Sequence, residues 1–160
     1  VYDFERKQVS VTEGSLLARR TDLAGYIRTR LSRTGDATIR EFQSNRLARA
    51  FPPTDGPEAE RALRALEVLP YLGVVERFAE SLICFEAGLR LAFPGISLQP
   101  TQANRTQPPG VSLEQRLVAM RLEIGDELYA QLEEANTGDL ALHQAALRRL
   151  DFARWQSAPS

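Results

Sequence analysis

The sequence of 160 residues contains one cysteine, Cys84, and one histidine, His143. A lone cysteine excludes an intramolecular disulfide framework and a cysteine-rich zinc site. A lone histidine excludes a zinc site or a mechanism that uses paired histidines. No apolar run reaches the roughly 18 residues that a membrane-spanning helix needs, and the N-terminal residues 1–7 have no apolar stretch typical of a signal peptide. We therefore expect no membrane partner, no metal and a cytoplasmic location.

The sequence also lacks the glycine-rich motifs of nucleotide-binding proteins. Neither Gly-x-x-x-x-Gly-Lys-Ser/Thr nor Gly-x-Gly-x-x-Gly after a strand occurs. His143 has no identifiable partners for a Ser–His–Asp triad, so we expect it on the face of the last helix. Cys84 lies in an apolar segment, which predicts a buried, inert thiol. No residue is therefore predicted to be catalytic.

What is present is typical of a globular domain. The composition is 43% hydrophobic and 26% charged, and the length fits about one domain. Residues 1–49 carry ten basic and six acidic side chains, whereas residues 50–160 carry ten basic and fifteen acidic ones. A basic front half can attract an anionic ligand, and the alternative is an ordinary solvated helix surface. No nucleic-acid partner is expected. The first residue is not methionine, which suggests that the chain starts inside a longer protein.

Apolar residues recur at helical spacing through most of the chain. Thr21-Asp22 and Ser112 suit helix N-caps, and Gln115 completes a capping box with Ser112. Residues 156–160 form a polar tail. The predicted helices cover about residues 23–33, 39–51, 57–69, 78–93, 112–134 and 139–155.

One short segment has a different pattern. Residues 70–76 form an apolar run bounded by Pro70 and by Glu76-Arg77, which predicts a strand or extended segment over 71–75. A single strand needs a partner for its backbone groups. It either pairs with sequence outside this chain or adopts another conformation. We also expect one core that includes the following helix, made by Leu63, Leu66, Val74, Phe78, Leu82, Phe85 and Leu89.

Two groups of polar residues are candidate binding residues. Glu76 and Arg77 follow the predicted strand, where open α/β sheets bind ligands; the alternative is an ion pair or a charge at a helix start. The loop between residues 97 and 110 is rich in Gln, Thr and Pro. It carries hydroxyl, amide and guanidinium groups that suit a phosphate, on Thr101, Asn104, Arg105 and Thr106. A solvated loop is the alternative there.

Four segments in order resemble the C-terminal half of the carbohydrate sulfotransferase family, in its bacterial and Golgi-type branch. The match covers about residues 20–152, and His143 stands where the family usually has tyrosine. The 62–82 segment is similar to a family stretch in which a helix leads into a strand and then Val-Gly-Leu-Thr-Glu-Arg-Phe-Asp-Glu-Ser-Leu. The segments are Asp22-Leu-Ala-Gly-Tyr-Ile with Phe42-Gln-Ser-Asn45; residues 62–82; the Asn104 loop; and Leu132-Glu-Glu-Ala-Asn136 with Asp139-Leu-Ala-Leu-His-Gln-Ala-Ala.

The resemblance implies transfer of a sulfuryl group from 3′-phosphoadenosine 5′-phosphosulfate (PAPS) to a sugar hydroxyl. The family has an α/β fold similar to P-loop kinases, and its phosphosulfate loop, 3′-phosphate segment and usual catalytic base lie in the N-terminal half, which has no counterpart here. We therefore expect residues 1–160 to be a single domain or fragment, mainly α with one or two short strands, and inactive alone. Its implied partners are the N-terminal half of the parent protein and a carbohydrate acceptor, and its implied location is the bacterial cytoplasm. The loop residues would bind PAPS, and Glu76 and Arg77 the acceptor.

A second hypothesis belongs to another class of protein. A non-catalytic helical binding or scaffold domain would share the same amphipathic patterns. It predicts a closed helical bundle without an unpaired strand and without affinity for the nucleotide.

Overall fold

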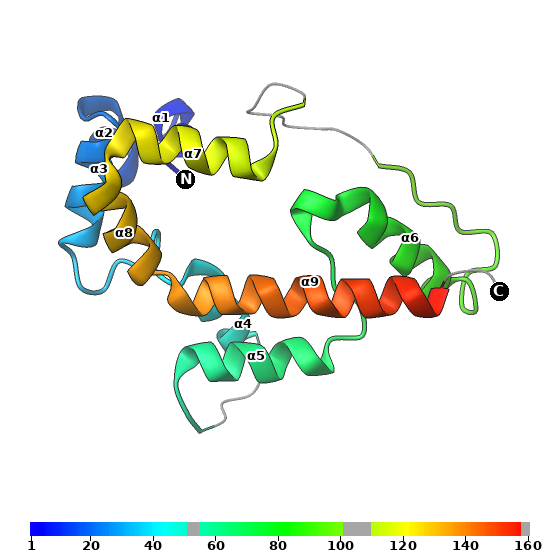
Figure 1. The fold of residues 1–160 in the computed structure, drawn as a ribbon. Helices are drawn as coiled ribbons and strands as arrows, with labels where there is room; N and C mark the ends of the chain where they lie inside the picture. Colours follow the sequence, from blue (N-terminus) through cyan, green and yellow to red (C-terminus); the bar gives the residue numbers. More distant parts are fainter. Residues whose placement is uncertain (51–54, 101–109, 158–160) are drawn as a thin grey trace. The chain divides into compact units, whose positions relative to one another are not determined.

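The computed structural model describes residues 1–50, 55–100 and 110–157, with side chains up to residue 153. The chain is mainly helical, as predicted (Figure 1). None of the described residues forms a strand. No helix among them is both long and apolar enough to cross a membrane. The elements are α1 (Tyr2–Lys7), α2 (Glu13–Arg20), α3 (Leu23–Leu31), α4 (Phe42–Arg49), α5 (Glu58–Val68), the 3₁₀ helix η1 (Val75–Arg77), α6 (Phe78–Leu89), α7 (Leu113–Ile124), α8 (Asp126–Glu134) and α9 (Thr137–Ser157).

The chain divides into two compact units. Unit 1 comprises residues 1–42 and 105–137, and unit 2 comprises residues 43–104 and 138–160. Unit 1 therefore contains α1, α2, α3, α7 and α8. Unit 2 contains α5, η1, α6 and most of α4 and α9.

Helix ends in unit 1 confirm the local signals in the sequence. The Asp22 carboxylate accepts the Gly25 backbone N–H at 2.7 Å and caps α3. Ser112 and Gln115 form the predicted capping box of α7. The predicted helix over 112–134 is instead two helices, because Gly125 has a φ of 85°. That left-handed conformation ends α7, and glycine adopts it without strain.

The helices of unit 1 enclose an apolar core and a buried ionic network. The core consists of Ala18, Tyr26, Ile27, Ile124, Leu128 and Tyr129.

The ionic network is centred on Arg30, which is only 8% exposed. Its guanidinium lies 2.8 Å from a Glu5 carboxylate oxygen and 2.8 Å from an Asp36 oxygen. The Tyr26 hydroxyl donates to Glu5 at 2.7 Å. A β-carbon at Gly14 would collide with Glu5 and Arg30, so glycine there allows α2 to approach the network. A buried arginine is tolerated because its charge is paired and hydrogen-bonded.

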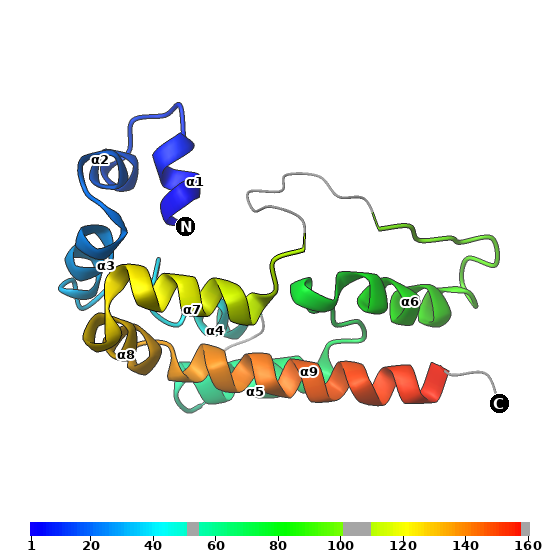
Figure 2. The same ribbon diagram turned by 45° about the horizontal axis from the view of Figure 1, so that its top comes forward.

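Unit 2 packs around one side of α9. Leu142, Ala146 and Leu150 repeat every four residues and are buried, which confirms the apolar pattern predicted for the last helix. Helix α5 lies beside α9 in both views (Figures 1 and 2). The buried cluster comprises Ala48, Ala62, Leu66, Val74, Leu142, Ala146 and Leu150.

The core face predicted for the helix after residue 77 is wrong. Phe78 is 47% exposed, and Leu82, Phe85 and Leu89 are only half-buried. The fully buried residue of α6 is Ser81. The helix is therefore turned so that a small polar residue faces the core and its larger apolar residues lie at the edge. Cys84 is half-buried and packs against the core, rather than fully buried.

The strand or extended segment predicted over 71–75 is confirmed as an extended segment at 71–74, without the strand alternative. Helix α5 ends at Val68, and residues 71–74 leave the helical conformation, with Val74 extended at φ −112° and ψ 124°. No strand pairs with them among the residues that the structure describes. Instead, the buried Val74 N–H donates to Ser81 Oγ at 2.9 Å. A side chain of the next helix thus replaces a ladder partner for this backbone group.

Candidate functional site

The predicted residues Glu76 and Arg77 lie in η1, the single turn that joins the extended segment to α6. The Arg77 backbone N–H donates to the Val74 carbonyl at 3.0 Å and closes this turn. Side chains of both residues contact α9. The charged residues gathered here are named the turn–helix cluster, and its members are Glu76, Arg77, Glu80, His143 and Asp151.

The guanidinium of Arg77 is held by two carboxylates. Its Nε and Nη2 donate to the two oxygens of Glu80 at 2.9 and 2.7 Å, and its Nη1 donates to Asp151 at 2.6 Å. These hydrogen bonds, first those with Glu80 and then that with Asp151, raise the pKa of Arg77 above its ordinary value. Such a bidentate pair fixes the plane of the guanidinium. The ion pair considered as an alternative from the sequence is therefore present at Arg77.

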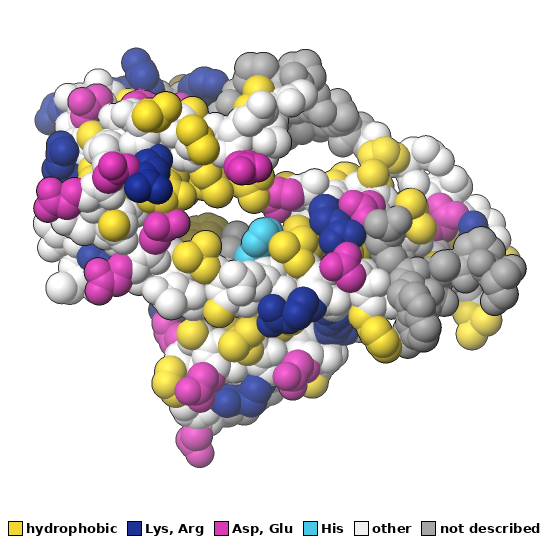
Figure 3. Space-filling view, viewed as in Figure 1, with side chains coloured by type: hydrophobic (Ala, Val, Ile, Leu, Met, Phe, Trp, Pro, Cys, Tyr) yellow, Lys and Arg dark blue, Asp and Glu magenta, His cyan; other side chains and the backbone are white. Residues whose placement is uncertain are grey.

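Glu76 lies beside the single histidine. One Glu76 oxygen is 3.6 Å from His143 Nε2, and the two side chains are 32% and 38% exposed. His143 Nε2 is itself buried and accepts or donates no hydrogen bond among the described residues. The imidazole is at the surface of the molecule, in cyan in Figure 3. A carboxylate next to an imidazole can hold or pass a proton.

The spacing along α9 brings the cluster together. His143 and Asp151 are eight residues apart, which is slightly more than two helical turns, so they share one side of α9. The consecutive residues Glu76 and Arg77 contact these two positions. No sequence pattern indicates this pairing, because its partners are separated by more than 65 residues along the chain.

The other predicted site residues lie outside the described residues. Thr101, Asn104, Arg105 and Thr106 all fall within 101–109. Their role as nucleotide-binding residues, and their proximity to Glu76 and Arg77, remain predictions.

Two polar residues without an assigned role in the sequence have structural ones. In unit 1, Asn136 Nδ2 donates to the Ile39 carbonyl at 2.8 Å, and its Oδ1 accepts the Glu41 N–H at 3.0 Å. In unit 2, the Asp139 carboxylate accepts the N–H groups of Gln43 and Ser44 at 3.0 and 2.7 Å. It therefore caps the start of α4 from a helix almost a hundred residues later, which no local pattern indicates.

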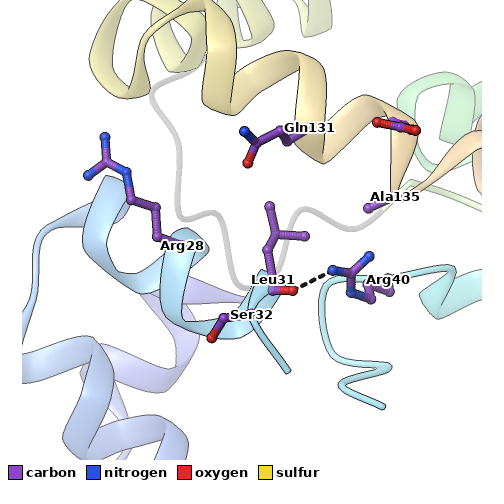
Figure 4. A pocket seen from close by; sticks show the side chains of 7 residues that line it. Arg28, Leu31, Ser32, Arg40, Gln131 and Ala135 are labelled. Atoms are coloured by element: carbon purple, nitrogen blue, oxygen red, sulfur yellow. Dashed lines mark hydrogen bonds between the residues drawn. The ribbon is translucent and has the colours of Figure 1, made fainter. Parts of the chain in front are cut away.

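Unit 1 contains a pocket of about 630 Å³ that the sequence did not predict (Figure 4). Its walls come from the last turn of α3, the segment after it and the last turns of α8. The lining includes two cations, one anion, two neutral polar side chains and two apolar ones. These are Arg28, Leu31, Ser32, Arg40, Gln131, Glu134 and Ala135. Across residues 1–50, 55–100 and 110–153, no three His, Cys, Asp or Glu side chains gather as metal ligands.

Comparison with known proteins gives one relative of undescribed activity. An uncharacterized protein of Archaeoglobus fulgidus is 34% identical over 144 residues, which are 88% of this chain and 57% of the relative. The chain thus spans a little over half the length of that protein. No family model matches the sequence, and no solved structure matches it.

Proposed function

We propose that this chain is the C-terminal portion of a PAPS-dependent sulfotransferase that acts on a carbohydrate hydroxyl. The observation that carries the proposal is the resemblance of residues 62–82, supported by three further segments in the same order. Here α5, the extended residues 71–74, η1 and α6 follow one another. That order agrees with the helix, extended segment and helix of the family stretch.

The residues of this stretch have contacts that suit a positioned site. Arg77 is clamped between Glu80 and Asp151, and Ser81 holds the end of the extended segment through Val74. Both contacts fix η1, on which Glu76 lies. In the proposed enzyme Glu76 binds an acceptor hydroxyl, because a half-exposed carboxylate is a strong hydrogen-bond acceptor. Arg77 acts as a positioning residue for it.

The remaining chemistry belongs to the proposed N-terminal half. Sulfuryl transfer, by analogy with phosphoryl transfer, needs donors that stabilise charge on the transferred group and the bridging oxygen. In the proposal those donors, and the phosphate-binding loop, lie outside these 160 residues, while Thr101, Asn104, Arg105 and Thr106 complete the nucleotide site. The isolated chain therefore binds the nucleotide weakly and does not catalyse transfer.

One observation favours the alternative, a non-catalytic helical scaffold. The Arg77 guanidinium is already bound to two carboxylates, so it has little capacity left for a ligand. Several large apolar side chains near it are also exposed, among them Phe78 and Ile83 at 47% and 59%. A scaffold would use such side chains to bind a protein partner.

Calorimetry with 3′-phosphoadenosine 5′-phosphate separates the two functions. The test compares the isolated chain with the longer protein that the proposal requires, and with the archaeal relative. We expect binding by the longer proteins and little or none by the isolated chain. In the longer protein, Arg105→Ala should weaken binding about tenfold or more, as for a lost hydrogen bond to a charged group. Arg148→Ala, at an exposed position of α9, is the matched control and should not weaken nucleotide binding.

A second assay measures sulfuryl transfer from PAPS to a panel of glycan acceptors. Glu76→Gln should lower the rate of transfer without changing nucleotide affinity. Absence of both nucleotide binding and transfer in the longer proteins would favour the scaffold.

A further inference from the structure

We propose that the pocket of unit 1 is a binding site for a phosphate or sulfate group carried by a small hydroxylated molecule. The proposal uses unit 1 alone and does not depend on the function proposed above. The volume of about 630 Å³ lies in the range of small-molecule sites in proteins. Nothing in the sequence pattern marked this site, since α3 and α8 are about a hundred residues apart.

The first argument concerns unpaired positive charge. Among the described residues, Arg28 and Arg40 form no ion pair, whereas Arg30, Arg33 and Arg121 in the same unit are each paired with a carboxylate. Other exposed arginines are unpaired too, but these two line the same concavity. Figure 4 shows them on either side of Leu31. Two guanidinium groups around one pocket attract an anion.

The second argument concerns the hydrogen-bond donors of Arg40. Its Nη2 donates to the Leu31 carbonyl at the end of α3. Its Nη1 group forms no hydrogen bond among the residues that the structure describes. An arginine presents five N–H donors. An oxyanion in the pocket would supply acceptors to this side chain.

The pocket also contains negatively charged groups that oppose the binding of an anion, so they must be compared with the two guanidinium groups. The C-terminal ends of α3 and α8 each carry about half a negative charge. Part of that charge is offset, because Arg40 covers the Leu31 carbonyl, the Ser32 hydroxyl donates to Thr29 at 2.9 Å and Thr137 donates to Glu134 at 2.9 Å. The two guanidinium charges therefore balance the Glu134 carboxylate and the two helix ends, so the free guanidinium donors, rather than an excess of positive charge, favour an anion.

The mixed lining selects the class of ligand. Guanidinium groups on different walls need acceptors that point in different directions, which a tetrahedral phosphate or sulfate provides better than a planar carboxylate. The Glu134 carboxylate and the Gln131 amide are suited to bind hydroxyl groups. Leu31 and Ala135 add a small apolar surface. A phosphate or sulfate ester of a polyol satisfies all of these groups.

Isothermal titration of the full 160-residue chain at constant ionic strength tests the site. The probes are inorganic phosphate, inorganic sulfate, acetate, glycerol 3-phosphate and glycerol. We expect glycerol 3-phosphate to bind more tightly than either inorganic anion, and acetate and glycerol to bind least. Comparing the affinities for inorganic phosphate and inorganic sulfate shows which of the two tetrahedral groups the pocket prefers.

Variants connect the binding to the pocket. Arg28→Ala, at an exposed position, should weaken the binding of glycerol 3-phosphate about tenfold. Arg20→Ala, at an exposed position of α2 in the same unit, should leave this binding unchanged. Glu134→Gln should strengthen the binding of inorganic phosphate and reduce the preference for glycerol 3-phosphate over it. Circular dichroism checks that each variant folds. The proposal is overturned if no oxyanion binds, or if Arg20→Ala weakens binding as much as Arg28→Ala does.

Discussion

The buried hydroxyl of Ser81 accepts the backbone N–H of Val74 at 2.9 Å and donates to the Arg77 carbonyl at 3.0 Å. One side chain therefore supports both the extended residues 71–74 and the turn η1. Ser81→Ala should lower the free energy of unfolding by about 1–3 kcal/mol, because it leaves a buried donor unpaired. Urea denaturation measures this loss. Ser97→Ala, at an exposed site of unit 2, is the control, and an equal effect at both sites would contradict the assignment.

The core of unit 2 should depend on α9 more than on the edge of α6. Leu150 is 1% exposed, so Leu150→Ala should cost about 2–5 kcal/mol, the usual range for a buried leucine replaced by a cavity. Leu82 is only half-buried, and Leu82→Ala should cost clearly less. Paired urea melts of the two variants give the comparison. A larger loss at Leu82 would restore the core face that the sequence predicted.

Because of its ionic network, the folding stability of unit 1 should depend on pH in the acidic range. Burial acts to raise the pKa of Asp36, but hydrogen bonds from Thr38 and Arg30 outweigh it and hold this pKa below its usual value. A carboxyl whose pKa is lower in the folded state stabilises the fold above its unfolded pKa of about 3.9, and this contribution disappears as the pH falls through the folded value.

Asp36→Asn removes that contribution. At pH 7 the variant should be less stable by about 1.5–3 kcal/mol, as for hydrogen bonds to charged groups. The difference from the natural sequence should shrink once the pH drops below about 4. Chemical denaturation at a series of pH values measures both. A difference that stays constant from pH 7 to pH 2 would show that charge is not its cause.

Asp139 should stabilise the start of α4. Its carboxylate accepts two backbone N–H groups, from Gln43 and Ser44, and Asp139→Ala should cost about 0.5–2 kcal/mol, the typical range for a lost N-cap. Thermal melting with Glu67→Ala, an exposed position of α5, as control gives the measurement. Equal melting temperatures for Asp139→Ala and the natural sequence would exclude a capping role.

Features that depend on near neighbours in the sequence were predicted correctly. The caps at Asp22 and Ser112 use groups three residues away, so the local pattern contains both partners. The strand or extended segment over 71–75 was predicted from an apolar run bounded by Pro70 and by Glu76-Arg77. Its backbone partner is Ser81 in the following helix, and an apolar run does not distinguish a ladder from such a side-chain contact.

The predicted core face of α6 was wrong, and the prediction of the candidate site was incomplete. Both depend on contacts between distant segments of the chain. The spacing of Phe78, Leu82 and Phe85 indicated a core face, but the tertiary contacts of unit 2 bury Ser81 between them. The sequence located Glu76 and Arg77 and offered an ion pair as one alternative. It did not contain the partners on α9, because contacts between distant segments leave no periodic signal.

Helix α1 has no fully buried residue. Tyr2 packs edge-on against Tyr26 and donates its hydroxyl to the Thr21 carbonyl, and the Glu5 carboxylate binds Arg30 and Tyr26. Local opening of α1 therefore exposes the apolar surface of one partly buried aromatic side chain, Tyr2, and of no fully buried residue. The amide hydrogens of α1 should therefore exchange with solvent through excursions much smaller than global unfolding. Each excursion removes the Glu5 counterion from Arg30, which is otherwise enclosed. Opening of the first six-residue helix therefore also destabilises the charged centre of unit 1.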